Sequence, residues 1–219
     1  MMKKLFCFTL LWIACLSFAG AQDKSFVFMF LNKRTDQKEL PKEQLDKLME
    51  GHMANIKKMA AEGHLIAAGP FEGGGGIFIF NTTSKEEVGE WIKGDPAIQA
   101  NRWNLEMFLY TPRTGSACLA KEPIQMTMYS FVRYIPNIAK FNVQNAPELF
   151  SKHDDYLKEI KKNGSVIAEG SFGDNEGGIL ILKEEPDLNL LENDPAVREG
   201  LLEINQKKLY IARGAFCEK

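Results

Sequence analysis

Two histidines hold matching positions in two parts of the chain. His52 and His153 each lie on the apolar side of a segment with helical periodicity, four residues before Ile56 and Leu157. The chain has three histidines in all, so two in the same phase are a stronger signal than one. Imidazole exchanges a proton near neutral pH, and a buried histidine that faces a cavity is therefore suited to acid–base catalysis. The competing interpretation is a hydrogen-bonded histidine of the core.

Two aspartates stand directly before a proline, again at matching positions. Asp95 precedes Pro96, and Asp194 precedes Pro195. An aspartate in this place is a good helix N-cap, because its carboxylate accepts a backbone N–H and proline suits the first helical position. A carboxylate that met an imidazole would fix the tautomer of the ring and raise its pKa. Spacing along the chain leaves both interpretations open.

Tyr129 and Arg133 are candidates for binding a ligand. Residues four apart in an extended strand point to the same face, so these two share one side of the strand predicted over 126–135. Together they could line a polar cavity that takes an anionic or phenolic molecule. The alternative is that this side of the strand faces solvent.

The composition argues against several other kinds of site and partner. Acidic residues outnumber basic ones, 29 to 27, and no basic patch is visible, so we expect no nucleic-acid partner. The histidines and cysteines lack metal-ligand spacing, and no motif points to an organic cofactor. The glycines at 73–76 lack the helix and lysine of a phosphate-binding loop and predict a turn. A small molecule is the expected partner.

The first 21 residues have the pattern of a signal peptide. Lys3 and Lys4 precede an apolar run over 5–18, and small residues follow at 19–21. The run is too short for an integral membrane span, and no later segment is long enough for one. We therefore expect export to the periplasm or the medium. A lipid anchor on Cys15 is the less favoured alternative.

The elements that must position these residues come twice and in the same order. Runs of β-branched and aromatic residues predict strands, and apolar residues at steps of three and four predict helices. The first set, strand-helix-strand-strand-helix-strand, is expected at 25–31, 41–62, 65–68, 77–80, 84–93 and 105–110. The second set, whose last strand should begin a few residues before 209, is expected at 126–135, 147–162, 166–168, 179–182, 187–191 and 209–212.

Glycines occur at matching positions in the two sets. Gly63 and Gly164 end the long helices, and Gly69 and Gly170 close the next strands, each pair 101 residues apart like the histidines. We therefore divide the chain into a signal peptide at 1–21, a first domain at 22–112, a linker at 113–123 and a second domain at 124–219. Helices tend to cover one face of such a sheet. Two halves that pack their open faces together would form one barrel-like pair.

Two cysteines remain once the signal peptide is removed. Cys118 and Cys217 each follow the last predicted strand of their half. Thiols tend to pair in the oxidising compartments that exported proteins enter. Three alternatives stay open: a disulfide between the halves, two free thiols, or a bridge to another chain.

Taken together, these motifs resemble the YCII-related domain. They are the helix histidine, the glycine-x-phenylalanine after the next strand, the Gly-Gly-Ile before the third strand and the Asp-Pro pair, and they occur in both halves. The resemblance implies an α+β fold in which two tandem ferredoxin-like domains pair as one dimeric α/β barrel. It also implies an intramolecular pseudo-dimer, alone or within a larger homo-oligomer.

The resemblance further implies where chemistry would occur. His52 would act with Asp95, and His153 with Asp194, as one acid–base pair in each domain. A relative of similar fold eliminates chloride from a chlorinated hydroxyquinol, so the implied reaction is elimination or isomerisation of a small organic molecule. No organic cofactor and no metal is implied.

The alternative is a non-catalytic binding or structural protein of the same kind. Family members often carry arginine one turn before the histidine, where this chain has Met49 and Phe150. The residue after the motif glycine is Pro70 in the first half and Ser171 in the second. These departures favour loss of activity, particularly in the second half.

Overall fold

The computed structural model describes residues 24–140, 142–173 and 177–218. The predicted signal peptide at 1–21, which includes Cys15, lies outside these ranges. Within them, no helix combines the length and the apolar character that a bilayer-spanning segment needs.

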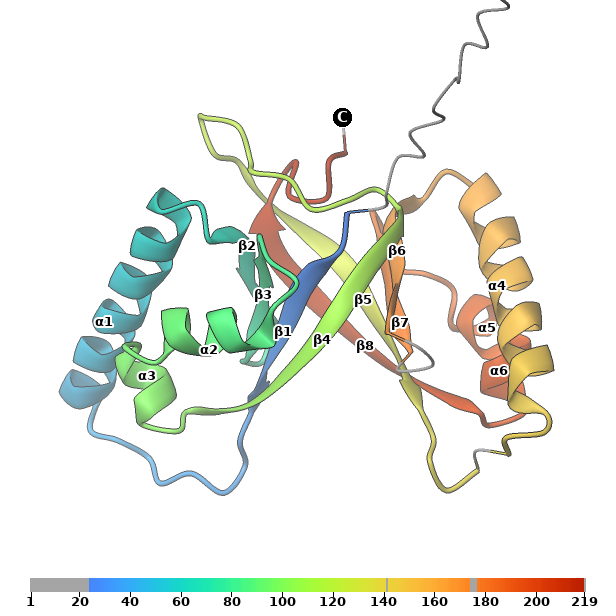
Figure 1. Ribbon diagram of the computed structural model, residues 1–219, viewed down its shortest axis with the longest axis horizontal. Coiled ribbons are helices and arrows are strands. Elements are labelled where there is room, and N and C mark those ends of the chain that lie inside the picture. Colours follow the sequence, from blue (N-terminus) through green and yellow to red (C-terminus); the bar gives the residue numbers. More distant parts are fainter. Residues whose placement is uncertain (1–23, 141, 174–176, 219) are drawn as a thin grey trace, which may run out of the picture.

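The described chain forms a mixed α/β structure whose order of elements repeats (Figure 1). The first half contains β1 (Phe26–Lys33), α1 (Lys42–Ala61), β2 (Leu65–Pro70), β3 (Gly76–Phe80), α2 (Lys85–Ile92), α3 (Pro96–Gln99) and β4 (Trp103–Thr114). The second half contains β5 (Met126–Pro136), α4 (Ala146–Lys162), β6 (Val166–Phe172), β7 (Gly178–Leu182), α5 (Leu188–Glu192), α6 (Pro195–Arg198) and β8 (Leu202–Ala212). Each half therefore has a long helix after its first strand and two short helices before its last.

All eight strands belong to one antiparallel sheet, in the order β2-β3-β1-β4-β6-β7-β5-β8. The two halves join where β4 pairs with β6. The edge strands also meet, through a bridge between Phe71 and Leu209. Beside that bridge the Glu72 amide donates to the Lys208 carbonyl at 2.9 Å. The sheet thus curves round into a barrel, and the helices of each half cover its outside (Figure 1).

The glycine of the repeated motif lies at the two seams between the halves. A β-carbon on Gly69 would stand 2.6 Å from the backbone oxygen of Tyr210 in β8. One on Gly170 would stand 2.5 Å from that of Thr111 in β4. A side chain cannot come so close to backbone, so glycine alone permits this approach of the strands. The phenylalanine two residues later is buried inside the barrel in both halves, and the motif therefore marks the interface.

The strands bury both of their faces, against different partners. On β1, Phe26, Phe28 and Phe30 point into the barrel, whose interior is rich in aromatic side chains. The alternate residues Val27 and Met29 pack beneath the helices of the first half. The same alternation holds for β5 in the second half. The molecule therefore has one core inside the barrel, shared by both halves, and a separate core under each set of helices.

Of the strands that extend beyond their predicted bounds, β4 and β8 matter most for the site. β4 continues through Arg113 and Thr114, into the predicted linker 113–123, because Thr114 still pairs with Glu169 of β6. β8 begins at Leu202, since it pairs along the whole length of β5. Arg113 is therefore part of the barrel rather than of a connecting loop.

A disulfide joins the segments that follow β4 and β8. The Sγ atoms of Cys118 and Cys217 are 2.11 Å apart. Backbone hydrogen bonds hold the same two segments together, from Ser116 to Phe216 at 3.2 Å and from Cys118 to Ala215 at 2.9 Å. Of the alternatives that the sequence leaves open, the structure contains the bond between the halves.

Candidate active site

The structure brings each candidate histidine to its candidate aspartate. Nδ1 of His52 lies 2.7 Å from Oδ2 of Asp95. Nδ1 of His153 lies 2.6 Å from Oδ2 of Asp194. All four residues are buried, and the two aspartates are inaccessible to solvent. Each pair connects the long helix of its half to the start of a short one.

Each aspartate also caps the short helix that it precedes. Oδ1 of Asp95 accepts the backbone amides of Ala97 and Ile98, at 3.0 and 3.1 Å. Oδ1 of Asp194 accepts that of Ala196 at 2.9 Å. One oxygen of each carboxylate therefore fixes the helix while the other meets the imidazole. The two roles that the sequence offers for these aspartates are compatible with each other.

The hydrogen bond of the first pair determines which nitrogen of the ring carries a proton. Burial alone would raise the pKa of the Asp95 carboxyl. The hydrogen bond and charge of His52 oppose this, with help from Asn55 and a backbone amide, and bring that pKa below its usual value. An ionised carboxylate can only accept, so Nδ1 of the ring donates. Nε2 of His52 is then the nitrogen that can take up or release a proton. In the second pair, Nδ1 of His153 meets Oδ2 of Asp194 in the same geometry.

The surroundings of the two histidines differ. His52 is stacked on Phe78, with ring centroids 5.8 Å apart, and tilted against Trp103 at 4.8 Å. His153 instead meets Tyr134 in an edge-to-face contact at 4.8 Å. The first imidazole thus contacts two aromatic rings, and the second contacts one.

The registers of the strands explain the more open setting of the second histidine. Trp103 lies opposite Lys33 of β1, and the matching residue of β8 is Leu202, opposite Pro136 of β5. Leucine is much smaller than tryptophan. Space that an indole fills in the first half is therefore left open in the second.

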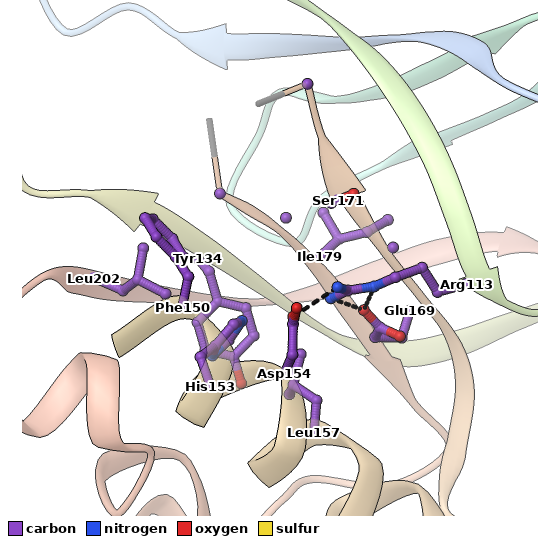
Figure 2. A pocket seen from close by; sticks show the side chains of 14 residues that line it. Arg113, Tyr134, Phe150, His153, Asp154, Leu157, Glu169, Ser171, Ile179 and Leu202 are labelled. Carbon is purple, nitrogen blue, oxygen red and sulfur yellow. Dashed lines mark hydrogen bonds and ion pairs between the residues drawn. The ribbon is translucent and has the colours of Figure 1, made fainter. Parts of the chain in front are cut away.

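A cavity of about 340 Å³ lies beside His153 (Figure 2). Its walls come from α4, β6 and β7, with single residues from β4, β5 and β8. Leu202 is one of those residues. In the first half, a hollow of about 460 Å³ opens between the loop after β1 and the start of α1. Trp103 lines this hollow, and His52 does not. The histidine of the second half is the one that borders a described cavity.

One side of the cavity carries paired charges (Figure 2). Arg113 donates through Nε to Oε1 of Glu169 at 2.7 Å, and through Nη1 to Oδ1 of Asp154 at 2.6 Å. Lys161 donates to the other oxygen of Glu169 at 3.0 Å. Glu169 is inaccessible to solvent, and its two cationic partners offset the cost of burying a carboxylate.

Arg113 comes from β4 of the first half and reaches the cavity of the second. Burial alone would lower the pKa of Arg113, but Glu169 and Asp154 outweigh it and raise that pKa above its usual value. The guanidinium therefore stays charged. It also has more N–H donors than the two carboxylates use. The cavity is in this sense built by both halves.

The first half has apolar residues where the second has these acids. The repeat spacing of 101 residues makes Ala68 the counterpart of Glu169 and Met53 the counterpart of Asp154. Ala68 packs in the core under the first-half helices, and Met53 is exposed. The charged wall is therefore a feature of the second half.

Tyr134 forms part of the cavity wall but is poorly suited to proton transfer. Its hydroxyl is buried, and no hydrogen-bond partner for it is found among the described residues. Burial, followed by the nearby Asp194 charge, raises the pKa of Tyr134 far above its usual value. The phenol therefore stays neutral, which leaves the imidazole of His153 as the candidate acid–base group of the cavity.

The described ranges hold no ready-made metal centre. No three histidine, cysteine, aspartate or glutamate side chains converge as ligands within 24–140, 142–173 and 177–218. The cavity beside His153 presents one imidazole, two carboxylates and one guanidinium. These groups suit an organic ligand that carries oxygen atoms.

Tyr129 and Arg133 share one face of β5, and that face is the inside of the barrel. Tyr129 donates to Oε1 of Glu218 at 2.7 Å, and Arg133 donates to Oε2 of Glu106 at 2.6 Å. Four residues along a strand separate them by roughly 13 Å. Neither lines the cavity beside His153. The structure therefore keeps these two residues apart from each other and from both His–Asp pairs.

Sequence reasoning missed the charged wall of the cavity. Arg113 lies in the segment predicted as a linker, and Asp154 and Glu169 carry no motif. A signal was present, because Glu169 places an acid in a strand whose counterpart in the first half has none. Phe150 and Ser171, which predicted weaker function in the second half, both line the cavity.

A comparison with protein families identifies part of the chain. Residues 26–106 match the model of the YCII-related domain. The match spans β1 to the middle of β4 and includes His52 and Asp95. No curated protein matches the chain significantly. The first half therefore contains a YCII-related domain.

Three solved structures resemble the fold at low sequence identity. A heme-binding protein from Thermus thermophilus is 10% identical with a TM-score of 0.46, over 87% of this chain and 91% of that one. A candidate monooxygenase from Fusobacterium nucleatum is 11% identical with a TM-score of 0.44, over 86% and 92%. A candidate chlorite dismutase is 8% identical with a TM-score of 0.45, over 86% and 94%. These likenesses concern the fold alone.

Proposed function

We propose that this chain, whose residues 26–106 form a YCII-related domain, contains a second such domain in residues 124–219. Each ferredoxin-like half would then supply four strands to one intramolecular barrel. The repeated strand order, β2-β3-β1-β4 and β6-β7-β5-β8, supports this division. The His–Asp pair at the same place in both halves supports it as well.

We propose further that the second half carries an acid–base active site for a small organic molecule. The supporting observation is the 2.6 Å hydrogen bond between His153 and Asp194 beside a cavity of about 340 Å³. A cavity of that size suits a compound with a single ring. Elimination and isomerisation are the reaction classes, because both begin with the removal of a proton by a base.

Each residue of the site has its own role in this proposal. Asp194 holds Nδ1 of His153, so that Nε2 acts as the base. Nε2 removes a proton from a carbon next to a carbonyl group, and the electron pair moves onto the carbonyl oxygen. Arg113 stabilises the negative charge that develops there. The imidazolium then returns the proton to another carbon in an isomerisation, or to the leaving group in an elimination.

The first half supports this site without repeating its chemistry. Phe78 and Trp103 lie against the His52 ring, and the pair that it forms with Asp95 holds α1 against α3. The last strand of the first half also supplies Arg113 to the cavity of the second. The two halves would therefore have different tasks.

We also propose export through the N-terminal 21 residues, to the periplasm or the medium. The disulfide between Cys118 and Cys217 is in keeping with an oxidising destination. Deletion of 1–21 should leave the protein in the cytoplasm with reduced cysteines, which cell fractionation and thiol labelling would measure. Full-length protein that stays in the cytoplasm would rule the proposal out.

Exchange of carbon-bound protons with solvent tests the catalytic assignment without knowledge of the final product. The purified protein is mixed in D₂O with a panel of small phenols and carbonyl compounds, and loss of C–H signals is followed by proton NMR. We expect enzyme-dependent exchange in at least one compound. His153→Gln should slow that exchange by about 10²- to 10⁴-fold. His52→Gln, the matched control, should stay within about threefold of the wild type, since its ring does not border the cavity.

Two results would overturn the assignment. Exchange that is as fast in His153→Gln as in the wild type would remove the histidine from the reaction. Compounds that shift the NMR signals of the His153 ring but never exchange or react would make the second half a binding module, which is the alternative function.

A further inference from the structure

A second cavity lies inside the barrel, on the opposite face of the sheet from the His153 cavity. Its volume is about 200 Å³. Arg133 borders it, whereas the next residue of β5, Tyr134, borders the His153 cavity, because successive side chains of a strand point to opposite faces. We call it the barrel-end site, and its main residues are Phe30, Phe71, Phe131, Arg133, Asn205 and Lys207.

Two cations lie over aromatic rings in the barrel-end site. The guanidinium carbon of Arg133 is 4.0 Å from the ring centroid of Phe30. Nζ of Lys207 is 4.8 Å from that of Phe71. Cation–π contacts of this length are favourable, and they hold the long side chains against the apolar wall. Positive charge is therefore kept at the cavity.

The charges of the barrel-end site are unequal. Glu106 accepts hydrogen bonds from Arg133 at 2.6 Å and from Asn32 at 2.9 Å. Among the described residues no carboxylate pairs with Lys207, which lies over Phe71 instead. Burial, and then the like charge of Arg133, lower the pKa of Lys207. The site thus holds two cations against one carboxylate, and an anion from solution would balance it.

The two cations have no charged counterparts at the matching positions of the first half. The registers of β1 and β5 make Phe30 the counterpart of Arg133. Those of β4 and β8 make Phe108 the counterpart of Lys207. The first half therefore supplies aromatic rings where the second supplies positive charges. Apolar side chains at both positions would pack a barrel interior, so packing alone does not require these cations.

We propose that the barrel-end site binds a small aromatic carboxylate. The carboxylate would lie on Nζ of Lys207, within reach of the Asn205 amide, and the ring would lie among the three phenylalanines. A single ring fits a space of about 200 Å³. An anion with one charge is preferred over phosphate, because Glu106 already supplies one negative charge and the remaining walls are aromatic. This site is independent of the function proposed for the His153 cavity.

Benzoate is the probe, and benzamide, which is neutral and has nearly the same shape, is its control. Binding to the purified protein is measured by isothermal titration calorimetry. Lys207→Met should weaken benzoate binding by about 10- to 100-fold, the value of a hydrogen bond to a charged group. Lys208→Met should bind as the wild type does, because Lys208 is on the other face of β8 and pairs with Glu185. Lys207→Arg keeps the charge and should stay within about threefold.

His153→Gln separates the two cavities. We expect it to bind benzoate as tightly as the wild type, whereas benzamide should bind at least about tenfold more weakly. Loss of benzoate binding in His153→Gln but not in Lys207→Met would move the anion to the other cavity and overturn the proposal. Equal affinity for benzoate and benzamide, or no benzoate binding at millimolar concentration, would overturn it as well. If Lys207→Met does not fold, Lys207→Gln, which also removes the charge, takes its place with the same expected loss of benzoate binding.

Discussion

The two halves of the molecule share a skeleton and a His–Asp pair but differ in what covers the histidine. In both, one carboxylate oxygen caps a short helix and the other holds Nδ1 of the imidazole. Trp103 lies against the ring in the first half, whereas Leu202 borders a cavity in the second. The pair that fixes the helices is therefore kept in both halves, while Trp103 and Leu202 give its histidine different surroundings. Under the proposed function, a paired histidine and aspartate can act only where the surrounding side chains leave room for a substrate.

The charged residues show a second difference between the halves: the first half contributes a charged residue to the second, and the second contributes none at the matching place. Arg113 crosses the seam from the first half to the cavity of the second. The matching place on β8 is Ala212, which offers no charge in return. The second site therefore depends on the first half, and the reverse does not hold.

The largest expected effect concerns the bond that joins the halves. Loss of the Cys118–Cys217 disulfide, which closes a loop with a sequence separation of 99, should lower the free energy of unfolding. The expected loss is about 4 kcal/mol, because the reduced unfolded chain gains entropy. Urea unfolding of the wild type and of the Cys118→Ser, Cys217→Ser double variant would measure it. A loss below about 1 kcal/mol would contradict this stabilising role.

The same experiment shows whether the halves unfold as one body. Trp91 and Trp103 both lie in the first half, so their fluorescence reports on that half, whereas circular dichroism reports on both. The shared sheet and the shared interior predict coincident transitions with and without the disulfide. Two separate transitions would mean that the halves are independent domains.

Filling the open space in the second half should abolish the activity proposed for it. Leu202→Trp recreates the arrangement of the first half, and the indole would occupy the space beside His153. We expect binding and solvent exchange of cavity ligands to fall by about 100-fold or more, since the ligand could no longer reach the base. The same NMR assay measures both. Ligand binding that survives in a folded Leu202→Trp variant would show that the substrate lies elsewhere.

The converse substitution tests the same comparison in the first half. Trp103→Leu should open a space beside His52, so that small phenols shift the NMR signals of that ring. Exchange should stay slow, because the charged wall has no equivalent there: the matching residues are Ala68 and Met53. Fast exchange in this variant would mean that the two halves differ in activity only because of the side chain that covers the histidine, and that the charged wall is not needed.

Much of the fold could be predicted from periodicity and from the repeat, but the site could be predicted only in part. Apolar spacing located the long helices, and Gly69 and Gly170 located the ends of the strands that follow them, but their place at the seams between the halves is seen only in the structure. Asp95 meets His52 from its position as a helix cap, and the Asp-Pro motif already predicts that cap. The cavity depends instead on Leu202, which is far along the chain from His153 and lies beside it only through the barrel. Arg113 is harder still to predict, because it acts across the seam from a strand end that the sequence presents as a linker.

A smaller effect on stability should follow from removal of the buried acid in the charged wall. Glu169→Ala leaves Arg113 and Lys161 without their shared carboxylate. We expect a loss of about 2 kcal/mol, which is less than for a fully buried pair because both cations can extend to solvent. Ala68 shows that a methyl group fits the matching position of the first half. A double variant with Arg113→Met should recover part of the loss, and additive losses in chemical unfolding would contradict the proposed pairing.

The smallest expected effect separates the two His–Asp pairs by their response to acid. Asn55 donates to Oδ2 of Asp95 at 3.3 Å, whereas its counterpart Tyr156 donates to the Leu190 carbonyl at 2.8 Å. Asn55→Leu should therefore cost about 1 kcal/mol at pH 7. The folded pKa of Asp95 lies below its unfolded value of about 3.9, so this stabilisation is present above pH 4 and is lost as the pH falls through the folded value.

The matched control for that pH dependence is Tyr156→Phe in the second half. Its hydroxyl bonds a backbone carbonyl that does not titrate, so its cost should stay the same between pH 7 and pH 3, whereas the cost of Asn55→Leu should shrink. Urea unfolding at both pH values measures the two differences. If the cost of Asn55→Leu were independent of pH, the asparagine would not be acting through the ionised aspartate. The first pair would then be held by its helix cap and its histidine alone, as the second pair is.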